Sequence, residues 1–166
     1  MVNLINSPDV YGDTIFCDDV RMEASQKLIY IGVYKGAMTI HVPFPVRLPN
    51  FCFAVSIQQR IKIFDPKITL RIFMPGDPDD ATSDAASLIA ELGEPQSGAT
   101  LKMAEENSTR AGIPQAEREY VHTAAVMQFQ SLEIKQSGFI KARADIGGNR
   151  YKIGTLAILP APTNKA

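Results

Sequence analysis

The sequence contains no tryptophan, only two cysteines and only two histidines. Without tryptophan the chain lacks the Cys–Trp–Cys pattern of a true antibody-type domain. Cys17 and Cys52 form no CxxC pair, so neither a disulfide framework nor a zinc site is expected. We expect both thiols to lie in strands as small buried hydrophobes.

Strong charge of either sign is also missing. Seventeen basic and eighteen acidic side chains leave a formal net charge of −1, which provides no bulk attraction to nucleic acid or to an anionic bilayer. No apolar run approaches the ~20 residues of a membrane-spanning helix, and residues 1–8 lack the pattern of a secretory signal. We therefore expect no nucleic-acid or membrane partner, and a cytoplasmic location or, for a phage structural protein, a virion-associated one.

Alternating apolar residues predict a strand-rich chain, because side chains in a strand point to opposite faces in turn. The clearest alternations cover residues 51–58 and 68–74. A hairpin is predicted where residues 27–34 and 37–42 flank Lys35-Gly36, and another where residues 139–146 and 151–159 flank Gly147-Gly148. The remaining predicted strands cover residues 14–20, 120–129 and 131–135.

Proline and glycine mark the predicted breaks between these strands. Pro43, Pro45 and Pro49 predict an extended connection and not a central strand, because proline cannot donate to a strand ladder. Asp65-Pro66 predicts a turn.

The middle of the chain, residues 75–119, differs in composition and is predicted to be an insertion. Alanine, leucine and glutamate predict one short helix over residues 82–92, ended by Gly93 and Pro95. Residues 94–119 are polar and predict a long loop. Residues 160–166 are expected to form a flexible tail.

These elements favour an all-β fold. We predict one domain over residues 1–166, an antiparallel β-sandwich of immunoglobulin-like type that carries the helical insertion.

Several segments also resemble a known family. Residues 16–21 (Phe-Cys-Asp-Asp-Val-Arg), 27–34 (Lys-Leu-Ile-Tyr-Ile-Gly-Val-Tyr), 43–45 and 48–49 are similar to the opening of a family of small bacterial and phage-encoded proteins of unknown function. Members end in a glycine-turn hairpin comparable to residues 144–159. The resemblance covers roughly the first sixty residues and the final hairpin. It implies a β-sandwich and a microbial or phage origin, and it implies no activity.

Asp18, Asp19 and Arg21 form the most conspicuous polar group. Adjacent strand residues point to opposite faces, so the two aspartates cannot share one acid–base site without a bulge. The favoured interpretation is structural. Asp19 pairs with Arg21 at i, i+2 on one face, while Asp18 caps a turn or bonds to neighbouring backbone.

Other candidate sites have weaker support. His41 and His122 fit no metal-ligand or nucleophile–base spacing, so they are expected to be partly exposed strand residues. Aspartates at positions 77, 79, 80 and 84 do not fit a calcium loop, and capping of a helix explains them. A basic stripe on one sheet face is predicted to be solvated; its residues are Arg71, Lys141, Arg143, Arg150 and Lys152.

The favoured function is a non-catalytic protein-binding or assembly module that acts through a sheet edge or the 75–119 insertion and needs no metal or cofactor. A phage structural component, an inhibitor or adaptor of a cellular protein, and a small-ligand sensor all remain open within this class. The interaction candidates are Asp18, Asp19, Arg21, Asp79, Asp80 and Arg110. The rival hypothesis is a small hydrolase that uses Asp18 or Asp19 with His41.

Overall fold

A computed structural model of the 166-residue chain describes residues 9–25, 27–78, 84–92, 106, 112 and 120–162. The ordered elements are almost all strands. They are β1 (Val10–Cys17), β2 (Asp19–Met22), β3 (Leu28–Ile31), β4 (Ala37–Ile40), β5 (Val46–Arg60), the 3-10 turn η1 (Ile61–Ile63), β6 (Ile68–Phe73), β7 (Leu88–Leu92), β8 (Tyr120–Ile134), β9 (Gly138–Ile146) and β10 (Asn149–Pro160).

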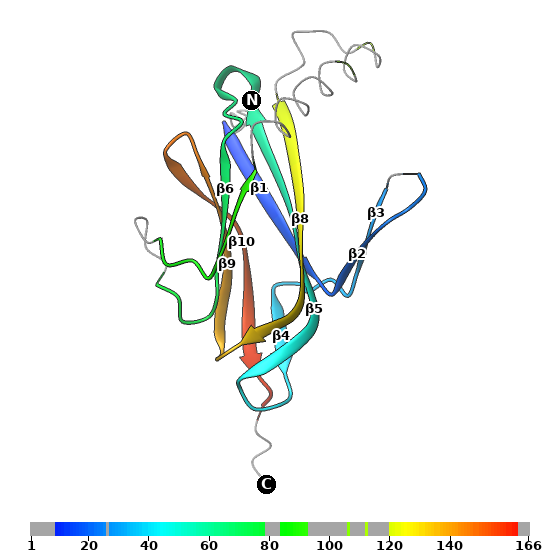
Figure 1. Cartoon of the computed structure of the whole chain (residues 1–166), viewed down its shortest axis with the longest axis vertical. Helices are drawn as coiled ribbons and strands as arrows, with labels where there is room; N and C mark the ends of the chain where they lie inside the picture. The colour runs from blue at the N-terminus through cyan, green and yellow to red at the C-terminus, as the bar shows by residue number, and fades with distance from the viewer. Residues whose placement is uncertain are drawn as a thin grey trace, which may run out of the picture.

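The strands form three sheets. One sheet has the order β1-β5-β8 and another has the order β4-β10-β9-β6-β7, while β2 and β3 form a two-stranded sheet of their own. The two larger sheets make up the body of the molecule, and β2 and β3 extend away from it (Figure 1). The all-β prediction is therefore confirmed. The sheets are mostly antiparallel, and their connectivity does not show an immunoglobulin topology.

The core lies between the inner faces of the two larger sheets. Alternation places one set of side chains inward, including Phe53 and Ile57 of β5 and Ile72 of β6, all of which are fully or almost fully buried. Phe53 makes edge-to-face contacts with Phe16 and Phe129, with ring centroids 5.8 and 5.7 Å apart. Burial of these rings, together with the aliphatic residues around them, stabilises the packing of the two sheets.

The predicted hairpin between residues 27–34 and 37–42 is wrong. β3 pairs antiparallel with β2, while β4 pairs parallel with β10. The chain leaves β3 through Gly32, whose φ of +67° turns it back toward the body, where the Tyr34 backbone N–H donates to the Phe16 carbonyl at 2.9 Å. The parallel β4–β10 pair also corrects the prediction of a wholly antiparallel fold.

The predicted helix over residues 82–92 is also wrong for its described part. Residues 84–86 have no regular structure, and Leu88–Leu92 forms β7, which pairs antiparallel with β6. The sequence Leu-Ile-Ala-Glu-Leu alternates as well as a strand requires, with Leu88, Ala90 and Leu92 packed against the core. Pairing with β6 outweighs the helix propensity of these residues.

Pro49 lies within β5, so residues 46–49 belong to a strand and not to the predicted connection. The β5–β8 register skips Pro49 and Ser131, and Ser131 has a φ of +63°. β1 pairs with β5 only as far as Cys52, which leaves Pro49 with a single neighbouring strand. Proline is tolerated there because the irregularity requires no ladder donor from it.

Other predictions are confirmed. β8 is continuous over both predicted segments, and β9 and β10 form the predicted hairpin. Gly147 and Gly148 have φ values of +56° and +77°, as a two-residue type I′ turn requires. Cys17 and Cys52 are buried free thiols in strands. Within the described residues, no helix is long and apolar enough to cross a membrane.

Candidate functional site

The two-stranded sheet of β2 and β3, hereafter the arm, is the most unusual surface of the molecule. It pairs Asp19 with Ile31 at its base and Met22 with Leu28 near its tip. Among the described elements, the arm contacts the body mainly through β2, which lies against β5 and β8. A two-stranded sheet on its own is marginally stable in water, so such an extension usually needs a further surface to pack on.

The register divides the arm into two chemically different faces. Directly paired residues share a face, so one face carries Asp19, Arg21, Ile29 and Ile31. The opposite face, hereafter the apolar arm face, carries Val20, Met22, Leu28 and Tyr30 and has no charged side chain. Met22 is 69% exposed, and Leu28 and Tyr30 are each 37% exposed.

The charged face of the arm contacts the β1-β5-β8 sheet at its base. Arg21 Nε donates to Asp19 Oδ2 at 2.8 Å, and Gln128 of β8 donates to Asp19 Oδ1 at 3.2 Å. The predicted pairing of Asp19 with Arg21 is therefore present. The hydrogen bond from Arg21 is the main reason that the pKa of the Asp19 carboxyl lies below its usual value. These contacts hold the base of the arm against β8. Ile29 and Ile31, on the same face as Asp19, are 42% and 39% exposed, so apolar side chains are exposed on both faces of the arm.

Asp18 fixes the base of the arm. Its backbone N–H donates to the Ile31 carbonyl at 3.0 Å, and its carboxylate accepts a hydrogen bond from the Tyr34 hydroxyl. Tyr34 in turn stacks on the buried Phe51, with ring centroids 5.7 Å apart. Burial, and then the Asp18 carboxylate, raise the pKa of Tyr34, so its hydroxyl remains a donor. The expectation that the Asp18 side chain would bond to backbone is wrong, because the folded arm brings Tyr34 to it.

The two cysteines lie just beneath this base, and both thiols are buried. Cys17 and Cys52 are directly opposite each other on β1 and β5, and the Cys52 thiol donates to the Asp18 carbonyl at 3.7 Å. Burial raises the pKa of Cys17 to about 11. The protonated thiol therefore predominates at neutral pH, whereas the thiolate is the reactive form.

The structure does not assemble the predicted hydrolase site. His41 is exposed and follows β4, and among the described residues no contact joins it to Asp18 or Asp19. Sequence reasoning missed another histidine contact, between His122 Nε2 and Ser56 Oγ at 2.8 Å. Alternation alone could place both residues on outward faces, but only the β5–β8 register brings them together. No carboxylate in the described part of the chain orients this imidazole, as a catalytic triad would require.

The remaining interaction candidates, Asp79, Asp80 and Arg110, lie outside the described residues. Within the described residues, no group of three histidine, cysteine, aspartate or glutamate side chains could hold a metal ion.

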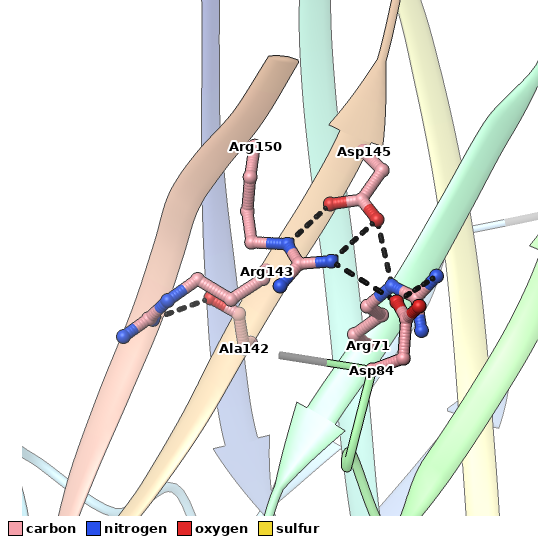
Figure 2. Close-up of polar contacts among 6 residues, drawn as sticks. All are labelled: Arg71, Asp84, Ala142, Arg143, Asp145 and Arg150. Atoms are coloured by element: carbon pink, nitrogen blue, oxygen red, sulfur yellow. Dashed lines mark hydrogen bonds and ion pairs between the residues drawn. The ribbon is translucent and has the colours of Figure 1, made fainter. Parts of the chain in front are cut away.

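The predicted basic stripe lies on the outer face of the five-stranded sheet, but it is not simply solvated. The Arg71 and Arg150 side chains are only 15% exposed, and Arg143 is 5% exposed. Figure 2 shows Arg71 and Arg150 converging on Asp145 and Asp84, while Arg143 turns toward the Ala142 carbonyl. The prediction of a solvated face is therefore wrong for these three arginines, because carboxylates and carbonyls bind them.

No family model matches the chain, and no curated protein is significantly similar to it, so the resemblance noted from the sequence stays a prediction.

Proposed function

We propose that the chain is a non-catalytic, protein-binding assembly module of phage or bacterial origin, and that the arm binds a second copy of the chain. The observation that carries this proposal is the apolar arm face. It combines four apolar side chains on an extension that has few contacts with its own body. Contiguous exposed apolar surface on a folded protein marks an interaction site.

The chemistry of β3 favours a second copy as the partner. All four of its residues, Leu28 to Ile31, are uncharged and exposed. Within the described part of the chain, only β2 pairs with β3, so the other edge of β3 can add a strand. Antiparallel pairing of two β3 strands about a two-fold axis at Tyr30 would place Ile29 opposite Ile31 of the second copy and would oppose no like charges. An interface of this kind is isologous and closes as a dimer.

The larger sheets supply a rigid scaffold for the arm in this proposal. We assign them to an immunoglobulin-like β-sandwich, a fold that commonly presents binding segments on a stable core. The buried aromatic cluster beneath Tyr34 supports this division of roles, because it fixes the base of the arm while the tip extends beyond it.

Sedimentation of the Leu28→Ser variant tests the proposal, with Leu159→Ser as the matched control. Both leucines are exposed, at 37% and 46%, but Leu159 lies on β10 and not on the arm. We expect the mass of the unmodified protein to rise with concentration. Leu28→Ser should weaken this association by roughly tenfold, as expected for an apolar interface residue.

Circular dichroism should show the same folded sheet content in both variants. A protein that stays monomeric at every concentration would exclude the second copy as the partner. Equal weakening by Leu28→Ser and Leu159→Ser would remove the arm as the contact surface.

A further inference from the structure

The outer face of the five-stranded sheet places positive charges directly opposite one another. Arg71 of β6 pairs with Arg143 of β9, and Arg143 pairs with Lys152 of β10. In the neighbouring row Asp145 of β9 pairs with Arg150 of β10. Like charges at paired positions destabilise a sheet, so a nearby anion is needed to hold this arrangement.

Asp145 is the internal anion that fixes two of these guanidinium groups. Arg71 Nε donates to Asp145 Oδ2 at 2.6 Å, while Arg150 donates to both carboxylate oxygens, at 2.7 and 2.9 Å (Figure 2). Hydrogen bonds from Arg150, and then from Arg71, lower the pKa of the Asp145 carboxyl, which keeps it ionised at neutral pH. Such charge-assisted bonds hold both planar groups in fixed orientations.

Asp84 is a second anion beside the same two arginines, but it is far more exposed to solvent than Asp145. One oxygen, Oδ1, meets Arg71 Nη2 at 3.2 Å and Arg150 Nη2 at 3.7 Å. The Asp84 side chain is 81% exposed, whereas that of Asp145 is 25% exposed. The two arginines therefore converge on a solvent-accessible position that an oxyanion already occupies.

Asp84 is not the residue that secures its own segment. The Asp77 carboxylate accepts hydrogen bonds from Met74 N at 2.8 Å, Ser87 N at 3.0 Å and Ser87 Oγ at 2.7 Å. These bonds join the end of β6 to the start of β7 without any contribution from Asp84. Loss of the Asp84 contact therefore leaves the anchoring of the segment intact.

We propose that Arg71 and Arg150, oriented by Asp145, form a binding site for a phosphate group, and that Asp84 occupies this site when no ligand is bound. An exposed ion pair contributes little, so a dianion can displace the Asp84 carboxylate. A phosphate in place of Asp84 would accept N–H bonds from the Nη2 groups of both arginines, because Asp145 already binds the Nε of each. Asp145 stays in place as the support that orients both arginines.

Titration calorimetry of the full chain with inorganic phosphate tests the site. The titration is made at constant ionic strength and at a pH of about 8. This pH lies above the second pKa of inorganic phosphate, which is about one unit higher than the ~6 of a phosphomonoester, so the dianion predominates. We expect Asp84→Asn to bind phosphate about fivefold more tightly than the unmodified protein, because an internal competitor is removed. Arg71→Lys keeps the charge but loses the planar group that binds Asp145 through Nε and the ligand through Nη2. It should bind phosphate at least about tenfold more weakly.

Two variants on the same sheet face control for bulk charge. Glu91→Gln removes a negative charge from β7, opposite Thr69, and Lys152→Gln removes a positive charge from β10. Glu91→Gln should not tighten phosphate binding as Asp84→Asn does. Lys152→Gln should not weaken phosphate binding as Arg71→Lys does. Acetate, a monoanion, should bind more weakly than phosphate to every variant.

Three outcomes would overturn the proposal. The first is the absence of phosphate binding to Asp84→Asn. This variant should fold normally, because the Asp84 side chain is exposed. The second is an equal gain in Glu91→Gln and Asp84→Asn, which would indicate bulk charge. The third is unchanged binding in Arg71→Lys with its thermal unfolding intact.

Discussion

Gly32 lies directly against the carboxylate that holds the base of the arm. A Cβ at this position would lie 1.9 Å from Asp18 Oδ2, and the φ of +67° is one that L side chains rarely adopt. Gly32→Ala therefore combines backbone strain with displacement of Asp18 from Tyr34. We expect the free energy of unfolding to fall by roughly 2–3 kcal/mol in urea denaturation, since each effect costs about 1 kcal/mol or more.

Gly36→Ala separates the two contributions to this loss. Gly36 has a φ of +81°, but a Cβ there would meet nothing within 4 Å. We expect this control variant to lose only the strain energy, about 1 kcal/mol. Equal losses in the two variants would show that Asp18 does not fix the arm.

The contrast between Asp19 and Asp18 shows which contacts a sequence can predict. Asp19 and Arg21 are two residues apart, so strand geometry alone predicts that they share a face, and they pair. Tyr34 is 16 positions from Asp18 and reaches it only because β3 folds back on β2. The position of a long-range partner depends on strand order, which alternation does not determine.

β9 carries the carboxylate that forms the ion pairs on the outer face of the five-stranded sheet, and these pairs stabilise the fold. Its Asp145 binds Arg71 of β6 and Arg150 of β10, so one carboxylate joins three neighbouring strands. Asp145→Asn should lower the free energy of unfolding at pH 7 by roughly 2–3 kcal/mol, because two partly buried arginines lose their counter-ion. Urea denaturation measures this loss. Asp13→Asn, on the exposed face of β1, provides the control and should change stability little.

The same carboxylate predicts how stability depends on pH. The pKa of Asp145 in the folded protein lies below the ordinary value of 3.8. The ionised Asp145 carboxylate therefore contributes fully to the free energy of unfolding well above pH 3.8. This contribution is lost as the pH falls through the pKa of Asp145 in the folded protein. We expect the stability difference between the unmodified protein and Asp145→Asn to shrink on acidification. A difference that stays constant down to the acid transition would contradict this assignment.

At the scale of whole elements, strands are predicted correctly where the alternation of apolar residues is strong. The prediction fails where the alternating segment is short. β6 and the β9–β10 hairpin follow from alternation and from a turn that requires glycine. β7 has five residues, too few to separate period 2 from period 3.6 against favourable helix propensity. β3 and β4 are adjacent in the chain but belong to different sheets, which no local pattern shows.

At the scale of the whole molecule, β1 of one large sheet contacts β10 of the other. Two glycines make this approach possible. A Cβ on Gly12 would lie 2.6 Å from Ile153 Cγ2, and one on Gly154 would lie 2.7 Å from Thr14 Cβ. The β9–β10 register shifts between Lys152 and Gly154, and this irregularity accompanies the inward position of Ile153, which is 3% exposed.

This close approach predicts a compensating pair of substitutions. Gly12→Ala should destabilise the fold by roughly 1–3 kcal/mol, because the added methyl group overpacks the contact between the sheets. Ile153→Ala removes Cγ2 and should cost about 2–4 kcal/mol by leaving a cavity. The double variant should lose at least about 1 kcal/mol less than the sum, since the new methyl group fills part of that cavity. Urea unfolding of all four proteins measures the coupling. Strictly additive losses would show that Gly12 is not what lets β1 approach β10.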